Sequence, residues 1–510
     1  MSSAARDEFT AKLSLGARLS WLVGCAPELI KNVAWDVFVL FYYSQVIGLS
    51  GARIGLALAI ILICDALIDP YVGTLSDRLQ HAPLGRRHTL MAASVLPFVI
   101  GLIGVFSPPR TFDQTGVLAW LVGFGLLARV SISFYTVPAL AVGAELSRDP
   151  QERSIIAMLR NVGNNLATML VPLLAFQVFF ESSPEFPKGQ LNPQPYPAFG
   201  LTIASIAAAC MLIGVIGTRP RLRALEMREA PKAEGDLPAR SFAASVAGFF
   251  SAFRITPNIL RLMVLVFLVL VTLATINQLT LHLSTYLWNL TSSHNQWVLI
   301  SAQAGTLVGV VGALRLTRRL EQRRVMIWGL VGFFVFALLS VAAPLSHLGP
   351  APGSDAIAVF VSVCRFAGGV AYGCYLVPLG ALILDIGDEH EVNTGRPQQG
   401  LVSAVHFLGL QAASAVVGLI AGLFLELIAF PVGVPAEQMP VEKVTSLGLF
   451  VCAVMAVASG LLILVVRTFD SSKDKQAAIA ARLISLRSAG KSPVPPAPDS
   501  GPQPAQALAP

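Results

Sequence analysis

The sequence predicts an all-α polytopic membrane protein with twelve transmembrane helices arranged in two six-helix halves. The chain has 510 residues, of which 55% are hydrophobic and only 13% charged, and its mean hydropathy is +0.68. A soluble protein carries about 25% charged residues. Apolar runs of about twenty residues recur along nearly the whole length. The loops between them alternate between basic and nearly uncharged.

Each apolar run is long enough to span a bilayer as one helix. The polar tail from Met1 to Arg18 precedes a first run that is too long for the core of a cleavable signal. We therefore expect the first helix to act as its own insertion signal. The predicted spans are 20–48, 53–76, 88–108, 116–146, 155–180, 197–218, 257–288, 294–318, 323–345, 355–385, 398–430 and 442–468.

Positive charge is confined to one set of loops, and this alternation stays in phase across all twelve spans. The basic set follows the second, fourth, sixth and eighth spans and includes both tails, whereas the other set holds little beyond Arg53, Arg110, Lys188 and Lys443. Basic loops remain on the cytoplasmic side, so both termini are expected there, most simply in a plasma (inner) membrane. The net charge of +7 then reflects topology, and we expect no nucleic-acid partner.

A long charged segment with three prolines divides the chain into two halves. The expected organisation is a cytoplasmic tail 1–19, a bundle 20–218, a cytoplasmic loop 219–256, a bundle 257–468 and a tail 469–510 that is disordered at its end. The halves echo one another. Val137-Pro138 in the fourth span and Val377-Pro378 in the tenth are each followed, seven residues past the proline, by an acid.

The six cysteines all lie inside apolar runs, and none forms a C-x-x-C pair. This spacing indicates neither a metal site nor a disulfide framework. No cluster of His, Ser and acidic residues converges at one interface, and nothing resembles an ion filter. An enzyme, a receptor and a channel are therefore disfavoured, and no cofactor is expected.

Two acids lie one helical turn apart inside the second span. Asp65 and Asp69 share a helix face at i and i+4, although one ionised Asp at bilayer depth costs about 2.5–3.5 kcal/mol. A cation shared by both carboxylates explains them. Pro70 lacks an N–H, which frees the carbonyl of Ala66 as a further ligand. The alternative is a structural ion pair with Arg129 of the fourth span; the two ideas are compatible, because an arginine can replace the ion when it leaves.

The motif around these acids resembles the signature of the glycoside–pentoside–hexuronide:cation symporters, a family of the major facilitator superfamily. Three further blocks support the resemblance and lie in register with the spans that they should occupy. The motif is Asp65-Ala-Leu-Ile-Asp69-Pro70-x-x-Gly73-x-x-Ser76-Asp77-Arg78 with Gly85-Arg86-Arg87, and the blocks are 41–50, 137–153 and 385–396.

The resemblance implies the major facilitator fold and a site for Na⁺, Li⁺ or H⁺. Carried over, the site consists of Asp65 and Asp69, completed by the hydroxyl of Ser133 in the fourth span. Hard cations prefer such oxygen ligands.

Four charged residues after the second span are expected to gate the transporter. We interpret Asp77, Arg78, Arg86 and Arg87 as a cytoplasmic latch between the second and third helices, which biases the open face without touching the solute.

The substrate-binding residues depart from the family pattern. Glu28 stands beside the first-span acid position, Thr136 replaces the fourth-span acid, and the eleventh-span lysine falls at Leu410 or Gln411. Arg160 matches the fifth-span arginine, with a role as partner of two nearby acids, Glu145 and Asp149, as the alternative. Asn277 of the seventh span is a further candidate for hydrogen bonding to a polar solute.

These observations predict a monomeric secondary transporter that couples a Na⁺ or H⁺ gradient to solute movement by alternating access. The expected cargo is a sugar, a glycoside or another small polar solute. The alternative is a lysophospholipid or amphipathic solute, which relatives in the family carry.

Overall fold

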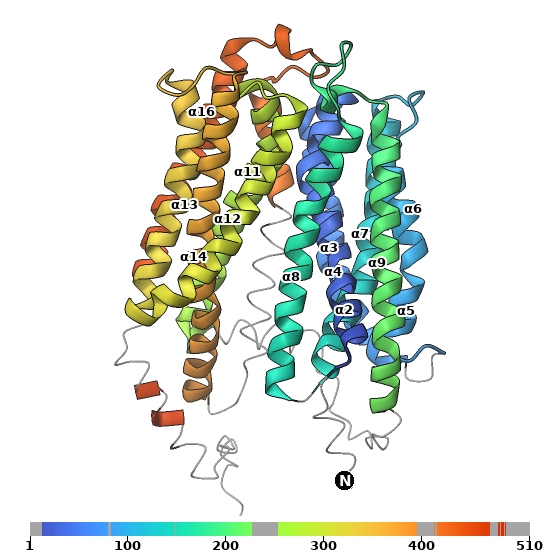
Figure 1. Cartoon of the computed structure of the whole chain (residues 1–510), viewed down its shortest axis with the longest axis vertical. Coiled ribbons are helices and arrows are strands. Elements are labelled where there is room, and N and C mark those ends of the chain that lie inside the picture. The colour runs from blue at the N-terminus through green and yellow to red at the C-terminus, as the bar shows by residue number, and fades with distance from the viewer. Residues whose placement is uncertain are drawn as a thin grey trace, which may run out of the picture.

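The computed structural model describes residues 13–79, 83–147, 149–226, 253–394, 413 and 416–469, with 478–479, 481–483 and 485 of the tail. Within these residues the fold is entirely helical, and two helical bundles stand side by side (Figure 1). This confirms the predicted fold class. Ten described helices are long and apolar enough to cross a membrane, and Val416–Leu427 is a shorter apolar helix within the predicted eleventh span.

The first predicted span forms a helix with several interruptions. It begins at Leu15, turns at Cys25 ahead of Pro27, and continues through two π-helical turns. The elements of this half are α2 (Leu15–Gly24), α3 (Ala26–Val33), η1 (Ala34–Val39), η2 (Tyr42–Val46), α4 (Gly51–Arg78), α5 (His88–Ala93), α6 (Val95–Val105), α7 (Gln114–Glu145), α8 (Pro150–Leu174), η3 (Ala175–Phe179), η4 (Gly189–Leu191) and α9 (Pro195–Glu226).

The sixth span, α9, continues to Glu226, past the boundary at 218 expected from the sequence. The second half runs through α11 (Pro257–His282), η5 (Leu283–Leu287), α12 (Ser292–Arg319), α13 (Gln322–Leu345), α14 (Asp355–Thr394), the helix Val416–Leu427, η6 (Ala436–Gln438) and α16 (Val441–Arg467).

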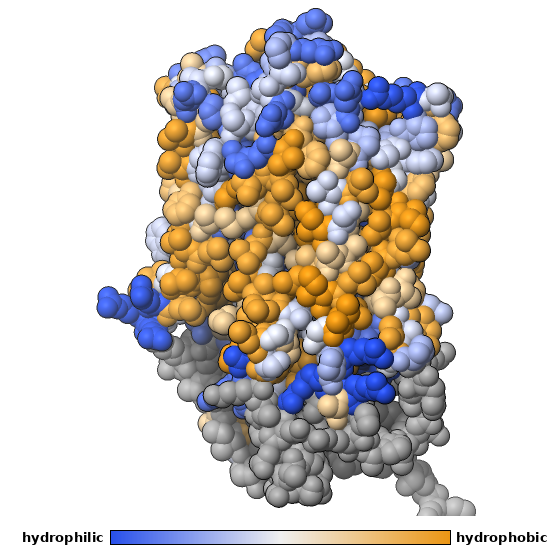
Figure 2. Space-filling view, turned by 45° about the vertical axis from the view of Figure 1, so that its right-hand side comes forward, coloured by the Kyte–Doolittle hydropathy of each residue, from blue (hydrophilic) through white to orange (hydrophobic). Residues whose placement is uncertain are grey.

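A broad hydrophobic band crosses the middle of the face shown in Figure 2, with hydrophilic side chains above and below it. On the second span, Leu67 is 70% exposed, whereas Asp65 two residues earlier is 4% exposed. The second span therefore turns its apolar side outward and its first acid inward. This pattern is the one that a bilayer requires.

The two halves meet at the end of the bundle opposite the start of α2, which we call the distal end (Figure 1). There Lys188 Nζ donates hydrogen bonds to the carbonyls of Asn289 and Leu290, each at 2.7 Å. Gln190 bridges to Thr285 at 3.0 Å and accepts a hydrogen bond from Ser292 at 3.1 Å. We call these contacts the distal gate.

Two further contacts between the halves join the first helix to the seventh span. The Ser44 hydroxyl lies 3.2 Å from His282 Nε2, and the Tyr286 hydroxyl donates to Gln45 Oε1 at 2.8 Å. Ser44, Gln45 and His282 are all buried. Among the described residues, the hydrogen bonds that join the halves thus gather toward the distal end.

Candidate functional site

Asp65 forms the centre of the candidate site. Its carboxylate is buried within α4, and both of its oxygens are bound by side chains of α7. Ser133 Oγ donates to Oδ1 at 2.9 Å, and Arg129 Nη1 donates to Oδ2 at 3.1 Å. Arg129 and Ser133 are one helical turn apart, so a single face of α7 supplies both donors.

Further charges of the first helix surround this ion pair. Lys31 is 3% exposed, and the charges of Asp65, Asp36 and Arg129 all act on it. The Arg129 guanidinium also lies 5.1 Å from the ring centroid of Trp35, within the range of a cation–π interaction. We call Lys31, Asp36, Asp65 and Arg129 the charge cluster. Glu28 also lies close enough to act on Lys31, so groups of opposite charge are gathered in this apolar region.

The structure brings two of the three predicted cation ligands, Asp65 and Ser133, into direct contact. Asp69 is half-buried one turn further along α4. Pro70 lies inside the same helix, as the freed carbonyl of Ala66 requires. The ligand set stays a prediction, and Arg129 stands where a cation would neutralise Asp65. The structure shows the ion pair between Asp65 and Arg129, and the cation site at the same carboxylate stays a prediction.

Three of the predicted substrate residues share one small cavity. Glu28, Thr136 and Arg160 line it together with Cys25 and Tyr135. Its volume is about 20 Å³, room for about one water. The cavity is too small for a sugar in this conformation, so a solute would require the surrounding helices to move.

Arg160 lies beside Glu28 rather than in contact with the acids of the α7–α8 connection. Glu145 binds the two arginines after the second span, and Asp149 caps α8 by accepting from the backbone N–H groups of Gln151 and Glu152. The alternative role of Arg160 as a partner of these acids has no support here. Asn277 is half-buried on α11 in the other half, and Gln411 lies outside the described residues.

The predicted latch is built around Glu145 at the end of α7. Arg86 Nη2 and Arg87 Nη2 both donate to Glu145 Oε1, at 2.8 and 3.1 Å, and Arg87 Nη1 donates to Ser76 Oγ at 3.1 Å. These contacts tie the α4–α5 connection to α7. The latch therefore joins three helices of one half, and its gating role stays a prediction. The side chains of Asp77 and Arg78 lie outside the described part of the structure.

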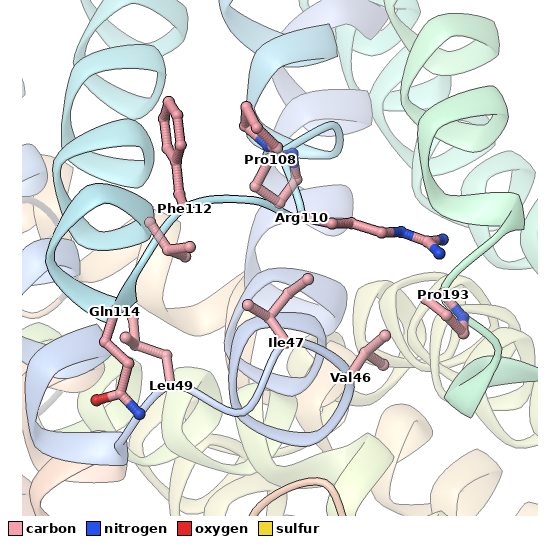
Figure 3. A pocket seen from close by; sticks show the side chains of 10 residues that line it. Val46, Ile47, Leu49, Pro108, Arg110, Phe112, Gln114 and Pro193 are labelled. Atoms are coloured by element: carbon pink, nitrogen blue, oxygen red, sulfur yellow. The ribbon is translucent and has the colours of Figure 1, made fainter.

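A separate cavity of about 270 Å³ lies at the distal end of the first half (Figure 3). Ile47, Leu49 and Phe112 line it, and Arg110 reaches along its side. Gln114 at its edge already accepts a hydrogen bond from Arg53 at 2.6 Å. None of the charge cluster lines this cavity, and we do not assign it to the site.

Sequence reasoning missed the role of Trp35, because a lone aromatic in an apolar run is an ordinary core residue. It also left Asp36 without a partner. The available signal was the rule that ionisable groups in the same membrane region pair with one another. Which ionisable groups pair across helices depends on how the helices pack, and the spacing of residues along one helix does not reveal this.

Two helical bundles with membrane-crossing helices and buried charges are typical of a transporter of the major facilitator type. Residues 20–472 match the family model described as MFS/sugar transport protein, so the chain belongs to this family. The uncharacterized symporter YnaJ of Bacillus subtilis is 25% identical over 82% of this chain and 84% of its own length. The isoprimeverose transporter of Lactiplantibacillus pentosus is 22% identical over 76% and 75% of the two chains.

Among solved structures, a bacterial homologue of the human lysosomal transporter Spinster has a similar fold. Its TM-score is 0.59 at 16% identity, and the match covers 98% of this chain and 100% of that one. At this identity the similarity concerns the fold alone. The predicted family resemblance is confirmed at the level of symporter-named relatives, and the protein is a transporter, not an enzyme.

Proposed function

We propose that this transporter is a cation:solute symporter that uses Na⁺ or H⁺ to move a sugar, a glycoside or another small polar solute. The observation that carries the proposal is the buried Asp65 carboxylate with the Ser133 hydroxyl at 2.9 Å. This oxygen pair, with Asp69 one turn away, provides the ligand chemistry of a hard monovalent cation. The names of the relatives, a symporter and an isoprimeverose transporter, agree with this class.

In this proposal Arg129 acts as a tethered counter-ion that holds Asp65 while the cation is absent. A coupling cation binds Asp65 only when the guanidinium leaves Oδ2. Arg129 also lies over the Trp35 ring, and its charge acts on Asp36. In this proposal these two groups hold the guanidinium after it leaves Asp65. The exchange keeps Asp65 neutralised but breaks the Arg129–Asp65 bond, which joins α7 to α4. The cation therefore binds the two conformations with different affinities, and its binding favours one of them.

The proposed orientation places both termini in the cytoplasm, as the basic loops indicate. The distal gate then faces outside and is closed, and the structure corresponds to an inward-facing state. Closure at this gate and occupation of Asp65 by Arg129 belong to the same state. We infer that this inward-facing state releases the cation and the solute to the cytoplasm.

The test compares Asp65→Asn and Asp69→Asn with Glu442→Gln, at an exposed acid in the first turn of α16. Uptake of labelled isoprimeverose, glucose and a lysophospholipid is measured in proteoliposomes under an imposed Na⁺ gradient or an imposed pH gradient. We expect a gradient to stimulate uptake of a sugar by the wild type and by Glu442→Gln, and the stimulation to disappear in the other two variants.

Thermal stability in NaCl and in choline chloride is the readout that does not depend on the solute. If Na⁺ raises the melting temperature of the wild type but not that of Asp65→Asn, the result supports a sodium site. If the melting temperature responds to pH and not to Na⁺, the result supports a proton as the coupling ion. Retention of full gradient-driven uptake in both Asp65→Asn and Asp69→Asn would contradict the site. Gradient-independent uptake of the lysophospholipid alone would contradict the proposed cargo and coupling.

A further inference from the structure

An apolar groove of about 420 Å³ lies between the neighbouring helices α12 and α14 of the second half. Its wall contains large hydrophobic side chains that the rest of the chain leaves uncovered. Trp297, Val359 and Val363 all line it and are 59%, 63% and 59% exposed. None of the residues assigned above to cation or solute binding lines this groove.

The groove faces away from the first half. On α12, Ser292 donates a hydrogen bond to Gln190 of the first half, and both Ser292 and Asn295 are buried. A helix turns about 100° per residue, which places Trp297 and Ser301 on the opposite side of α12 from these two residues. The groove is therefore no part of the space between the halves, and its exposed apolar wall lies on the outer surface, where a membrane protein contacts lipid.

The length of the groove matches one leaflet of a bilayer. Both helices begin at the distal end, α12 at Ser292 and α14 at Asp355. Phe366 lines the groove eleven residues after Asp355, and so lies about 16 Å further along the helix axis. Half of a hydrocarbon core about 30 Å thick is about 15 Å. Trp297 lies near the outer end, at the level where tryptophan rings gather in membrane proteins.

The outer end of the groove carries an exposed acid. The Asp355 side chain is 94% exposed, and its Oδ1 lies 3.4 Å from Nε2 of His294. Within the described part of the chain, no lysine or arginine forms an ion pair with Asp355. A primary ammonium complements this carboxylate, because it carries a positive charge and three N–H donors. A quaternary ammonium has the charge without the donors, and an anionic headgroup is repelled.

We propose that the groove between α12 and α14 binds a phospholipid of the distal leaflet that bears a primary amine, of the phosphatidylethanolamine class. One acyl chain lies along Val359, Val363 and Phe366, and the ammonium donates to Asp355. Burial of the chain drives binding, and the ammonium selects the headgroup. This lipid is a partner at the outer surface and not the cargo, so the inference does not rest on the proposed function.

The test uses lipids with brominated acyl chains, because bromine in contact with an indole ring quenches its fluorescence. Purified protein is placed in phosphatidylcholine nanodiscs that contain a fixed fraction of brominated phosphatidylethanolamine, phosphatidylcholine or phosphatidylglycerol with identical chains. The quenching that belongs to Trp297 is the difference between each protein and the same protein carrying Trp297→Phe. We expect a preference of about two- to fivefold for phosphatidylethanolamine, the range of an exposed ion pair.

Two variants separate the groove from general surface charge. Asp355→Asn should lose the headgroup preference, so that the three brominated lipids quench Trp297 equally. Glu442→Gln, at an exposed acid in the first turn of α16, should keep the preference of the wild type. Equal quenching by the three lipids in the wild type, strongest quenching by phosphatidylglycerol, or a preference that survives in Asp355→Asn would overturn the proposal. Equal losses in Asp355→Asn and Glu442→Gln would do the same.

Discussion

Both oxygens of the Asp65 carboxylate are occupied by protein donors, Arg129 on one side and Ser133 on the other. A buried ion pair contributes little net stability, but breaking it leaves one uncompensated charge and costs about 3–5 kcal/mol. Arg129 is thus both a stabilising partner of Asp65 and a competitor for any cation that binds there. These two roles have opposite consequences when the arginine is removed.

Arg129→Gln should destabilise the protein in choline chloride by about 3–5 kcal/mol, because Asp65 loses its counter-charge. If Na⁺ is the coupling ion, Na⁺ should restore much of the loss, and the Na⁺ concentration for half-maximal stabilisation should fall relative to the wild type. Thermal unfolding across a NaCl series measures both effects.

Arg110→Gln, at an exposed arginine of the same half, is the matched control and should follow the wild type. An unchanged melting temperature in Arg129→Gln would show that the ion pair does not stabilise the fold. If Na⁺ raised the melting temperature of Arg129→Gln less than that of the wild type, Arg129 would not compete with Na⁺ for Asp65.

At the scale of elements, glycines let α4 and the helix Val416–Leu427 of the other half approach closely. A Cβ added to Gly51 of α4 would lie 2.5 Å from the carbonyl oxygen of Gly422, and one added to Gly55 would lie 2.9 Å from that of Gly418. Both pairs have the G-x-x-x-G spacing that lets membrane helices touch through their backbones. α4 therefore carries the candidate cation site near its middle and a closure contact at its distal end.

Gly422→Ala should weaken closure at the distal end, because its new Cβ would lie 2.7 Å from Gly55 Cα and the helices would have to separate. We expect the population to shift toward a state open at this end. The distance between spin labels at Thr111 and Leu348, exposed residues on the two halves, reports the shift. Gly460→Ala, where a Cβ meets nothing within 4 Å, is the control. Equal label distances in the two variants would exclude the glycine contact as a determinant of closure.

For the whole molecule, the equilibrium between open and closed states is linked to the protonation of Lys188 in the distal gate. Burial lowers the pKa of Lys188 from 10.5 to about 8, and Glu437 partly opposes this effect. When the gate opens, the exposed amine should regain its ordinary pKa near 10.4. The closed state then binds its proton more weakly than the open state does.

Raising the pH from about 8 to about 10.5 should therefore favour the closed distal gate, since the open state retains its proton over that range and the closed state loses it. The shift in the equilibrium constant is at most about 250-fold, because the two pKa values differ by about 2.4 units and each unit corresponds to tenfold. The labels at Thr111 and Leu348 measure it. Lys188→Arg, which stays charged, should show a smaller dependence on pH. A gate that opens as the pH rises would contradict the sign of this linkage.

The sequence by itself determined the helical membrane fold and the second-span acids, because both depend on local properties. Apolar run length sets the spans, and the i, i+4 spacing sets a shared helix face. The family match and the all-helical structure confirm the fold. Ser133 was expected near Asp65 from the family resemblance, and the structure places it there.

Only the tertiary structure decided which charges meet. Whether Arg129 reaches Asp65, and whether Arg160 lies beside Glu28 or near Glu145, depend on how separate helices are rotated and packed. Ionisable side chains inside a membrane are stable only when another helix or a solute compensates them. Sequence spacing places each charge on its own helix, and the packing of the helices supplies its partner.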